Sequence, residues 1–215
     1  MTNSKRIAFL ELAVFFFLTP IILYFTATRW NIHLALWLGS LYAICRLAKH
    51  NKATWHDVWH GQEWTKAQKK FALFRFLIST ALVLLLTQYL APERLLTFPM
   101  LRPGFWLLVM FLYPLLSVLP QELVFRSYFF RRYTIIFHKE RTLLVLSAIA
   151  FAFVHIVFHN VVSPLLCLIA GYFFAHSYSQ HRSLKWALIE HAAYGCMVFT
   201  AGIGFYFLVG GATRF

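Results

Sequence analysis

Long runs of apolar residues, separated by short polar and basic segments, dominate the pattern along this chain. Seven such runs are present, at about 7–28, 30–48, 72–91, 104–130, 142–159, 161–179 and 183–211. Most of them reach the roughly 20 residues that an α-helix needs to cross the hydrocarbon core of a bilayer. Because that core offers no water to unpaired backbone groups, the pattern predicts helical spans. We therefore expect an all-α, polytopic integral membrane bundle of about seven transmembrane helices, or eight if a short helix forms near 200–212.

The composition supports a membrane protein and excludes several other classes. Of 215 residues, 60% are hydrophobic and only 13% are charged, and the mean hydropathy is +0.66. A soluble domain carries about 25% charged residues. These values exclude an ordinary cytosolic enzyme, a disordered chain and a secreted disulfide scaffold. Cys45, Cys167 and Cys196 show no disulfide or zinc-site spacing and are interpreted as packed thiols.

The net charge of +13 is carried by segments between the apolar runs. With a cytoplasmic N-terminus, 14 basic residues would face the cytoplasm: Lys5, Arg6, Arg46, Lys49, Lys52, Lys66, Lys69, Lys70, Arg131, Arg132, Lys139, Arg141, Arg182 and Lys185. Four would face outward: Arg29, Arg94, Arg102 and Arg214. This bias predicts that the N-terminus is cytoplasmic and the C-terminus external. The anionic bilayer, rather than a nucleic acid, is the expected partner of these charges, and the basic loops favour a bacterial inner (plasma) membrane.

The chain shows no internal repeat and is interpreted as one membrane domain, 1–215. Residues 1–103 would form N-terminal helices and a basic cytoplasmic loop, in which 49–71 has the tryptophan content of an interfacial segment. Residues 104–211 would form a helical core that carries the candidate chemistry.

Ionisable residues within the apolar runs mark that chemistry, because each is costly at membrane depth and needs a partner or a function. Glu122 and Arg126 are four residues apart, a spacing that places them on one helix face. His155 lies in the next run, and His191 lies in the last run beside Glu190. A structural ion pair would explain Glu122 and Arg126 alone. Two histidines and a carboxylate on three separate spans instead favour a polar site.

Pro114 and Pro120 precede Glu122 and remove backbone donors, which would open room for water around the polar residues. A carboxylate with two histidines nearby could activate that water and stabilise an oxyanion, as in a hydrolase without a covalent nucleophile. A metal-dependent hydrolase with Glu122, His155 and His191 as ligands is an alternative. A proton-relaying transporter is another, although such transporters commonly show internal repeats.

Three motifs between 121 and 195 resemble those of the CPBP family of intramembrane proteases, also called the CAAX protease and bacteriocin-processing, or Abi, family. The first family motif is two adjacent acids, three residues and an arginine, and it reads Gln121-Glu122 to Arg126 here. The second is Phe-x-x-x-His, here Phe151 to His155. The third, a histidine four residues before an asparagine or similar residue, reads His191 to Gly195.

The resemblance implies a helical membrane core with a polar cavity that opens to the cytoplasm. It implies an endopeptidase that hydrolyses a membrane-anchored or lipidated protein or peptide by activating water, without a cofactor. By the same resemblance, Glu122 is the candidate base, Arg126 its charge partner, His155 the co-base and His191 the oxyanion donor.

The chain departs from the family pattern at two positions. Gln121 stands where the first glutamate is usual, and Gly195 stands where a polar side chain is usual. Asn160 is a candidate to replace the missing amide, and Glu190 is a candidate to orient His191 or to supply a second carboxylate. The departures also leave open a catalytically inactive membrane scaffold or chaperone that uses the same cavity.

Overall fold

A computed structural model describes residues 3–26, 28–50 and 54–210, and within these ranges the regular structure is helical, without strands. Lys52 and Arg214 of the charge count lie outside the described residues, as do parts of the predicted segments 49–71 and 200–212. The main helices are listed here: α1 Asn3–Ala13, α2 Thr19–Thr26, α3 Arg29–His50, α4 Trp55–Trp59, α5 Lys66–Leu90, α6 Thr97–Leu101, α7 Pro103–Tyr113, α8 Leu119–Glu122, α9 Phe129–Tyr133, α10 Glu140–Val154, α11 Val162–His181 and α12 Leu184–Ala201.

Short 3-10 and π-helical segments join or extend several of these helices. The 3-10 segments are η2 Pro92–Arg94, η5 His155–Phe158 and η6 Ile203–Phe207. The π-helical segments are η1 Val14–Leu18, η3 Pro114–Val118 and η4 Leu123–Tyr128. Segment η1 makes α1 and α2 one continuous helix, and η3 and η4 join α7, α8 and α9 into another.

Five of the helices described are long and apolar enough to cross a membrane. They are Asn3–Thr26, Lys66–Leu90, Pro103–Tyr133, Glu140–Phe158 and Val162–His181. The chain is therefore an integral membrane protein, as predicted. The remaining two predicted runs do form helices, α3 and α12, but the total of seven or eight spans is not confirmed. Segment η6, in the region of the predicted eighth helix, has five residues and is too short to cross a bilayer.

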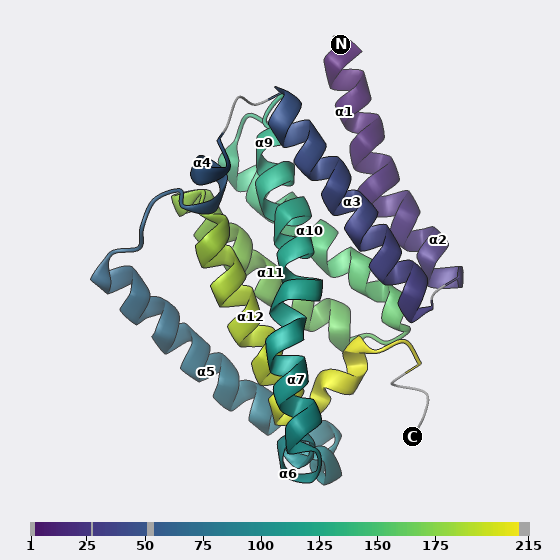
Figure 1. Cartoon of the computed structure of the whole chain (residues 1–215), viewed down its shortest axis with the longest axis vertical. Helices are drawn as coiled ribbons and strands as arrows, with labels where there is room; N and C mark the ends of the chain where they lie inside the picture. Colours follow the sequence, from purple (N-terminus) through teal and green to yellow (C-terminus); the bar gives the residue numbers. More distant parts are fainter. Residues whose placement is uncertain (1–2, 27, 51–53, 211–215) are drawn as a thin grey trace.

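The long helix Pro103–Tyr133 lies in the middle of the bundle (Figure 1). Helices α10 and α11 pack against each other, and α11 continues the contact to α12. Helices α1 to α3 cover one side, whereas α5 stands at the opposite edge and contacts α12 (Figure 1). Most side chains of α5 are exposed, and most of the exposed ones are apolar, as expected for a helix that faces lipid.

Two π-helical turns interrupt the central helix on either side of α8. Pro114 and Pro120 have no N–H group, so they cannot donate to the carbonyl groups four residues earlier. The carbonyl freed by Pro114 belongs to Met110, and the Cys196 thiol of α12 contacts it at 3.9 Å. Such wide turns occur often at functional sites. Here they flank Gln121 and Glu122, and the second turn contains Arg126.

Candidate active site

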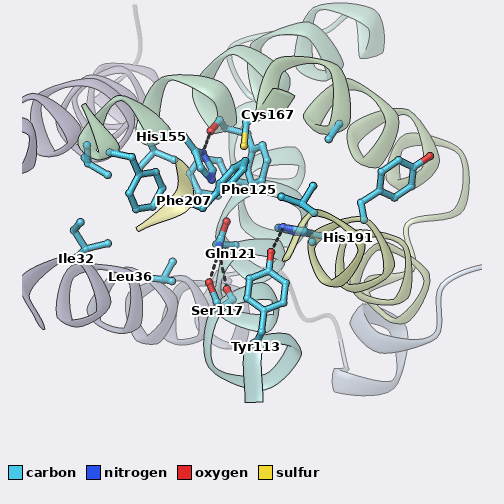
Figure 2. Close-up of a pocket in the computed structure, with 18 of the residues that line it drawn as sticks. Ile32, Leu36, Tyr113, Ser117, Gln121, Phe125, His155, Cys167, His191 and Phe207 are labelled. Carbon is cyan, nitrogen blue, oxygen red and sulfur yellow. Dashed lines mark hydrogen bonds between the residues drawn. The ribbon is translucent and has the colours of Figure 1, made fainter. Parts of the chain in front are cut away.

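A cavity of about 560 Å³ lies between the helices. Its lining is mostly apolar and comes from both the N-terminal helices and the core helices. Polar side chains meet in one part of it (Figure 2): Tyr113, Ser117, Gln121, His155 and His191. A few convergent polar groups in a large apolar pocket are typical of a ligand or substrate site.

Glu122 connects two of the predicted residues beneath the cavity wall. Its Oε1 lies 2.8 Å from Nδ1 of His191, and its Oε2 lies 3.2 Å from Nε of Arg126. Both Glu122 and Arg126 are fully buried. Nδ1 donates to the carboxylate, so in the neutral imidazole the other ring nitrogen of His191 is an acceptor, and it is directed to the cavity side. The structure therefore brings Glu122, Arg126 and His191 together.

His155 is held in a similar way by a backbone group. Its Nδ1 lies 2.6 Å from the carbonyl oxygen of Phe151, which can only accept a hydrogen bond. Nδ1 is therefore the protonated nitrogen, and Nε2 is unprotonated. The residue ends α10 and begins the 3-10 turn η5, so the helix end places its ring at the cavity. Both histidines thus present Nε2 as an acceptor.

The Phe151 ring is the common packing surface of the site. Its centroid lies 4.9 Å from the guanidinium carbon of Arg126, 4.9 Å from the His155 ring and 5.3 Å from the His191 ring. A Cβ atom on Gly171 would come within 2.9 Å of this ring. Gly171 is therefore needed for the close approach of α11 to Phe151. The Phe-x-x-x-His motif supplies both the histidine and the ring that positions it.

Arg126 has further partners that fix it in place. Its guanidinium donates to Oγ of Ser147 at 2.9 Å and to the carbonyl of Phe125 at 3.3 Å. Ser147 in turn donates to the Phe125 carbonyl at 2.8 Å. These contacts satisfy Nη1 of the buried guanidinium, whereas its Nε and Nη2 make no hydrogen bond with the described groups. Arg126 is therefore a fixed charge partner of Glu122, and it does not line the cavity.

Gln121 and Glu122 are neighbours in sequence but differ in exposure. Gln121 lines the cavity, and its Nε2 donates to the carbonyl and the Oγ of Ser117, at 3.0 and 2.8 Å (Figure 2). Its Oε1 is buried without a hydrogen-bond partner among the described groups. Glu122, in contrast, has both oxygens engaged and no exposed surface. The side chain that faces the cavity is thus an amide.

Two other predicted residues lie elsewhere. Asn160 donates from Nδ2 to the carbonyl groups of Phe158 and Tyr206 and accepts from the backbone N–H of Ser163. Its amide therefore stabilises the turn before α11 and does not line the cavity. Glu190 forms a buried ion pair with Arg75 of α5, away from the cavity lining. The structure does not bring either residue to the cavity.

Residues 103–197, which include all three motifs, match the family model described as type II CAAX prenyl endopeptidase Rce1-like. This segment is Rce1-like. The match agrees with the family resemblance of the motifs and, because the matched family is one of endopeptidases, it supports a peptidase. No curated protein and no solved structure matches the chain.

The Rce1-like segment contains one cavity residue that the sequence did not indicate. Tyr113, at the end of α7, places its hydroxyl oxygen 3.4 Å from Nε2 of His191. A hint was available at Gly195, because a small residue at a position that is usually polar leaves space for another side chain. That hint identifies no particular residue, since Tyr113 is 82 positions away.

A metal centre in the Rce1-like segment is not supported by the donor arrangement. Across residues 3–26, 28–50 and 54–210, no group of three His, Cys, Asp or Glu side chains is placed to hold a metal ion.

Proposed function

We propose that this protein is an intramembrane endopeptidase of the CAAX-protease type. It would hydrolyse a peptide bond in a lipidated or membrane-anchored protein or peptide. The observation that carries this proposal is the Glu122–His191 pair behind the cavity wall, with the His155 ring packed on the same Phe151 side chain. The match of residues 103–197 to a family of peptidases supports it.

His191 is the proposed general base. A buried carboxylate that accepts a hydrogen bond from Nδ1 fixes the imidazole tautomer and leaves Nε2 as the acceptor. A water molecule in the cavity would lose its proton to this Nε2 as its oxygen attacks the peptide carbonyl. Glu122 then stabilises the imidazolium, and Arg126 holds the carboxylate in place. Glu122 as the direct base stays a prediction, and it would require the carboxylate to leave its two partners.

His155 is proposed to assist on the other side of the reacting bond. Its neutral Nε2 can accept a hydrogen bond from the N–H of the scissile bond, while the proton that His191 took from the water passes to the leaving nitrogen. Gln121 has no acid–base chemistry, but its amide can orient the peptide by hydrogen bonding. In this scheme His191 transfers the proton, and the side chains of Gln121 and His155 orient the peptide.

The cavity favours a substrate with an apolar part. Its volume lies within the range of small-molecule sites, roughly 300–1,000 Å³, and its lining is mainly aliphatic and aromatic. A lipidated peptide, or the end of a hydrophobic helix, would bury its apolar portion there. The opening toward the cytoplasm remains a prediction from the resemblance.

A catalytically inactive scaffold or chaperone is the second candidate. The amide of Gln121 favours it, because this cavity-facing position holds no acid. The same cavity would then bind a peptide or helix without cutting it.

The test is cleavage of quenched fluorescent peptides by purified protein in liposomes, with prenylated, acylated and unlipidated membrane-anchored versions of each peptide. We compare wild type with His191→Ala, in which Glu122 remains paired with Arg126. The kcat is expected to fall on the order of 10⁴-fold, the upper range for loss of a general base. His138→Ala, an exposed histidine outside the cavity, is the matched control and should cleave like wild type.

Full activity of folded His191→Ala would contradict the proposed base. Peptide binding by wild type without cleavage of any version would favour the scaffold.

A further inference from the structure

The Tyr113 side chain fills the space beside Gly195, and the mechanism proposed above gives neither residue a role. Gly195 lies one turn after His191 on α12, and both residues line the cavity. A Cβ atom built on Gly195 would lie 2.2 Å from the hydroxyl oxygen of Tyr113 and 2.4 and 2.5 Å from two of its ring carbons. Non-bonded atoms do not approach so closely in a packed interior. The phenol therefore occupies the space that any side chain at 195 would need.

The phenol is fixed in this space by contacts on both sides. Its hydroxyl oxygen lies 3.4 Å from Nε2 of His191, as Figure 2 shows. Its ring packs edge-on against Phe199, one turn beyond Gly195, with centroids 5.2 Å apart. A polar atom is thus held beside His191, at the place where a polar side chain at 195 would have put one.

The hydrogen bonds of His191 determine what this hydroxyl can do. While His191 is neutral, Nδ1 donates to Glu122, and the single lone pair of Nε2 can accept from the Tyr113 hydroxyl. A water molecule that binds at Nε2 takes the place of this hydroxyl and frees the phenol hydrogen. When the water attacks, its O–H bond breaks and the proton moves to Nε2. The water oxygen bonds to the carbonyl carbon, and the electron pair of the C=O double bond moves to the carbonyl oxygen. Protonated Nε2 can no longer accept from the phenol, whose hydrogen stays available to the substrate.

We propose that Tyr113 is a catalytic residue, whose released hydroxyl hydrogen donates to the carbonyl oxygen of the bound peptide in the tetrahedral intermediate. Gly195 provides the space for it. This role rests on the proposed peptidase function. The donor is available when negative charge develops, which is when a hydrogen bond lowers the barrier.

The other amides considered for this role are already engaged. The Nδ2 group of Asn160 donates to two backbone carbonyls, and the Nε2 group of Gln121 donates to Ser117. Each would have to give up existing hydrogen bonds to reach the substrate oxygen, whereas the Tyr113 hydroxyl would be freed by the water that binds at His191.

The first experiment removes only the hydroxyl oxygen. Tyr113→Phe keeps the ring that contacts Gly195 and Phe199. The kcat is expected to fall about 10²-fold, as when one oxyanion donor is lost, with KM changed less than about twofold. Tyr178→Phe is the matched control, because Tyr178 lies outside the cavity lining and its buried hydroxyl has no hydrogen-bond partner in the part of the chain that the structure describes. It should retain both kinetic constants.

The second experiment moves the polar atom from one helix to the other. Gly195→Asn alone should lower the unfolding temperature and the kcat, because its Cβ would overlap the phenol. Tyr113→Ala with Gly195→Asn removes that overlap and supplies an amide from α12. The double variant is expected to recover at least about tenfold in kcat over Tyr113→Ala, a non-additive result that a double-mutant cycle measures.

The outcomes separate the two proposals. Cleavage by wild type and by Tyr113→Phe with equal kcat overturns the role of Tyr113 and leaves the peptidase function intact. Absence of cleavage by wild type overturns the peptidase function and the role of Tyr113 with it. A reduced kcat for Tyr113→Phe, an unchanged kcat for Tyr178→Phe and recovery in the double variant support the proposal.

Discussion

Two carboxylates in the core, Glu122 and Glu190, are each paired with an arginine, yet their surroundings differ. Glu122 pairs with Arg126 on its own helix and also binds His191, which lines the cavity. Glu190 pairs with Arg75 and thereby links α12 to α5. Glu190 is the sequence neighbour of His191, but the helix directs the two side chains to different sides. A buried ion pair alone therefore indicates structure, and the imidazole between the carboxylate and the cavity indicates chemistry.

The largest expected difference between the two pairs is in activity. Glu122→Gln should lower kcat about 10²- to 10⁴-fold, because the amide no longer fixes and stabilises the His191 ring. Glu190→Gln should leave kcat close to that of wild type. Each variant leaves a buried arginine without its carboxylate, so each should lose about 3 kcal/mol of unfolding free energy. Peptide cleavage and thermal unfolding, measured on the same samples, check both statements. Equal losses of kcat would contradict the distinction between the pairs.

A smaller effect is expected from the serines that contact the two arginines. Ser147→Ala removes an acceptor 2.9 Å from Arg126 and should cost about 1–3 kcal/mol of unfolding free energy, because a buried charged donor loses a partner. Ser177→Ala removes a weaker contact, at 3.4 Å from Arg75, and should cost less. Chemical unfolding in detergent micelles measures both. A larger loss for Ser177→Ala would show that the Glu190 pair is the more tightly held.

The smallest effect is expected at a third, exposed pair, Glu63 with Lys185. The hydrogen bond from Lys185 lowers the pKa of Glu63 below its usual 4.5. A carboxyl whose pKa is lower in the folded state stabilises the fold above its unfolded pKa, and this contribution is lost as the pH falls through the folded value. The unfolding temperatures of wild type and Glu63→Gln should therefore differ slightly at pH 7 and converge below about pH 4. A difference that persists at low pH would assign the contribution to another contact.

The sequence predicted those parts of the site that depend on local spacing. The four-residue interval between Glu122 and Arg126 does place them in one ion pair, and the apolar runs do form helices. The positions of the charged residues along the chain were not enough to predict the number of membrane spans. Helices α3 and α12 carry basic and acidic side chains that tertiary contacts and the helix ends accommodate, so hydropathy alone does not classify them.

The sequence could not predict features that depend on how distant helices meet. Consecutive residues on a helix point about 100° apart, so either Gln121 or Glu122 could have faced the cavity until the packing of the central helix was known. The sequence does not distinguish an asparagine that faces a cavity from one that stabilises a turn. In the structure, the hydrogen bonds of Asn160 with the Tyr206 carbonyl and the Ser163 N–H place it in the turn. The contact of Tyr113 with Gly195 joins α7 to α12, and no sequence pattern near either residue indicates it.

The apolar lining of the cavity has a consequence for how such a protein can change. The residues proposed for chemistry all lie within 103–197, whereas side chains such as Phe16, Ile32 and Leu36, from helices before residue 103, form part of the wall. Part of the cavity shape is therefore encoded in a stretch of the chain that is separate from the one that carries the chemistry. Substitutions in α2 and α3 can alter which molecules fit without touching the reactive groups, so selectivity can diverge between related proteins while the reaction is retained.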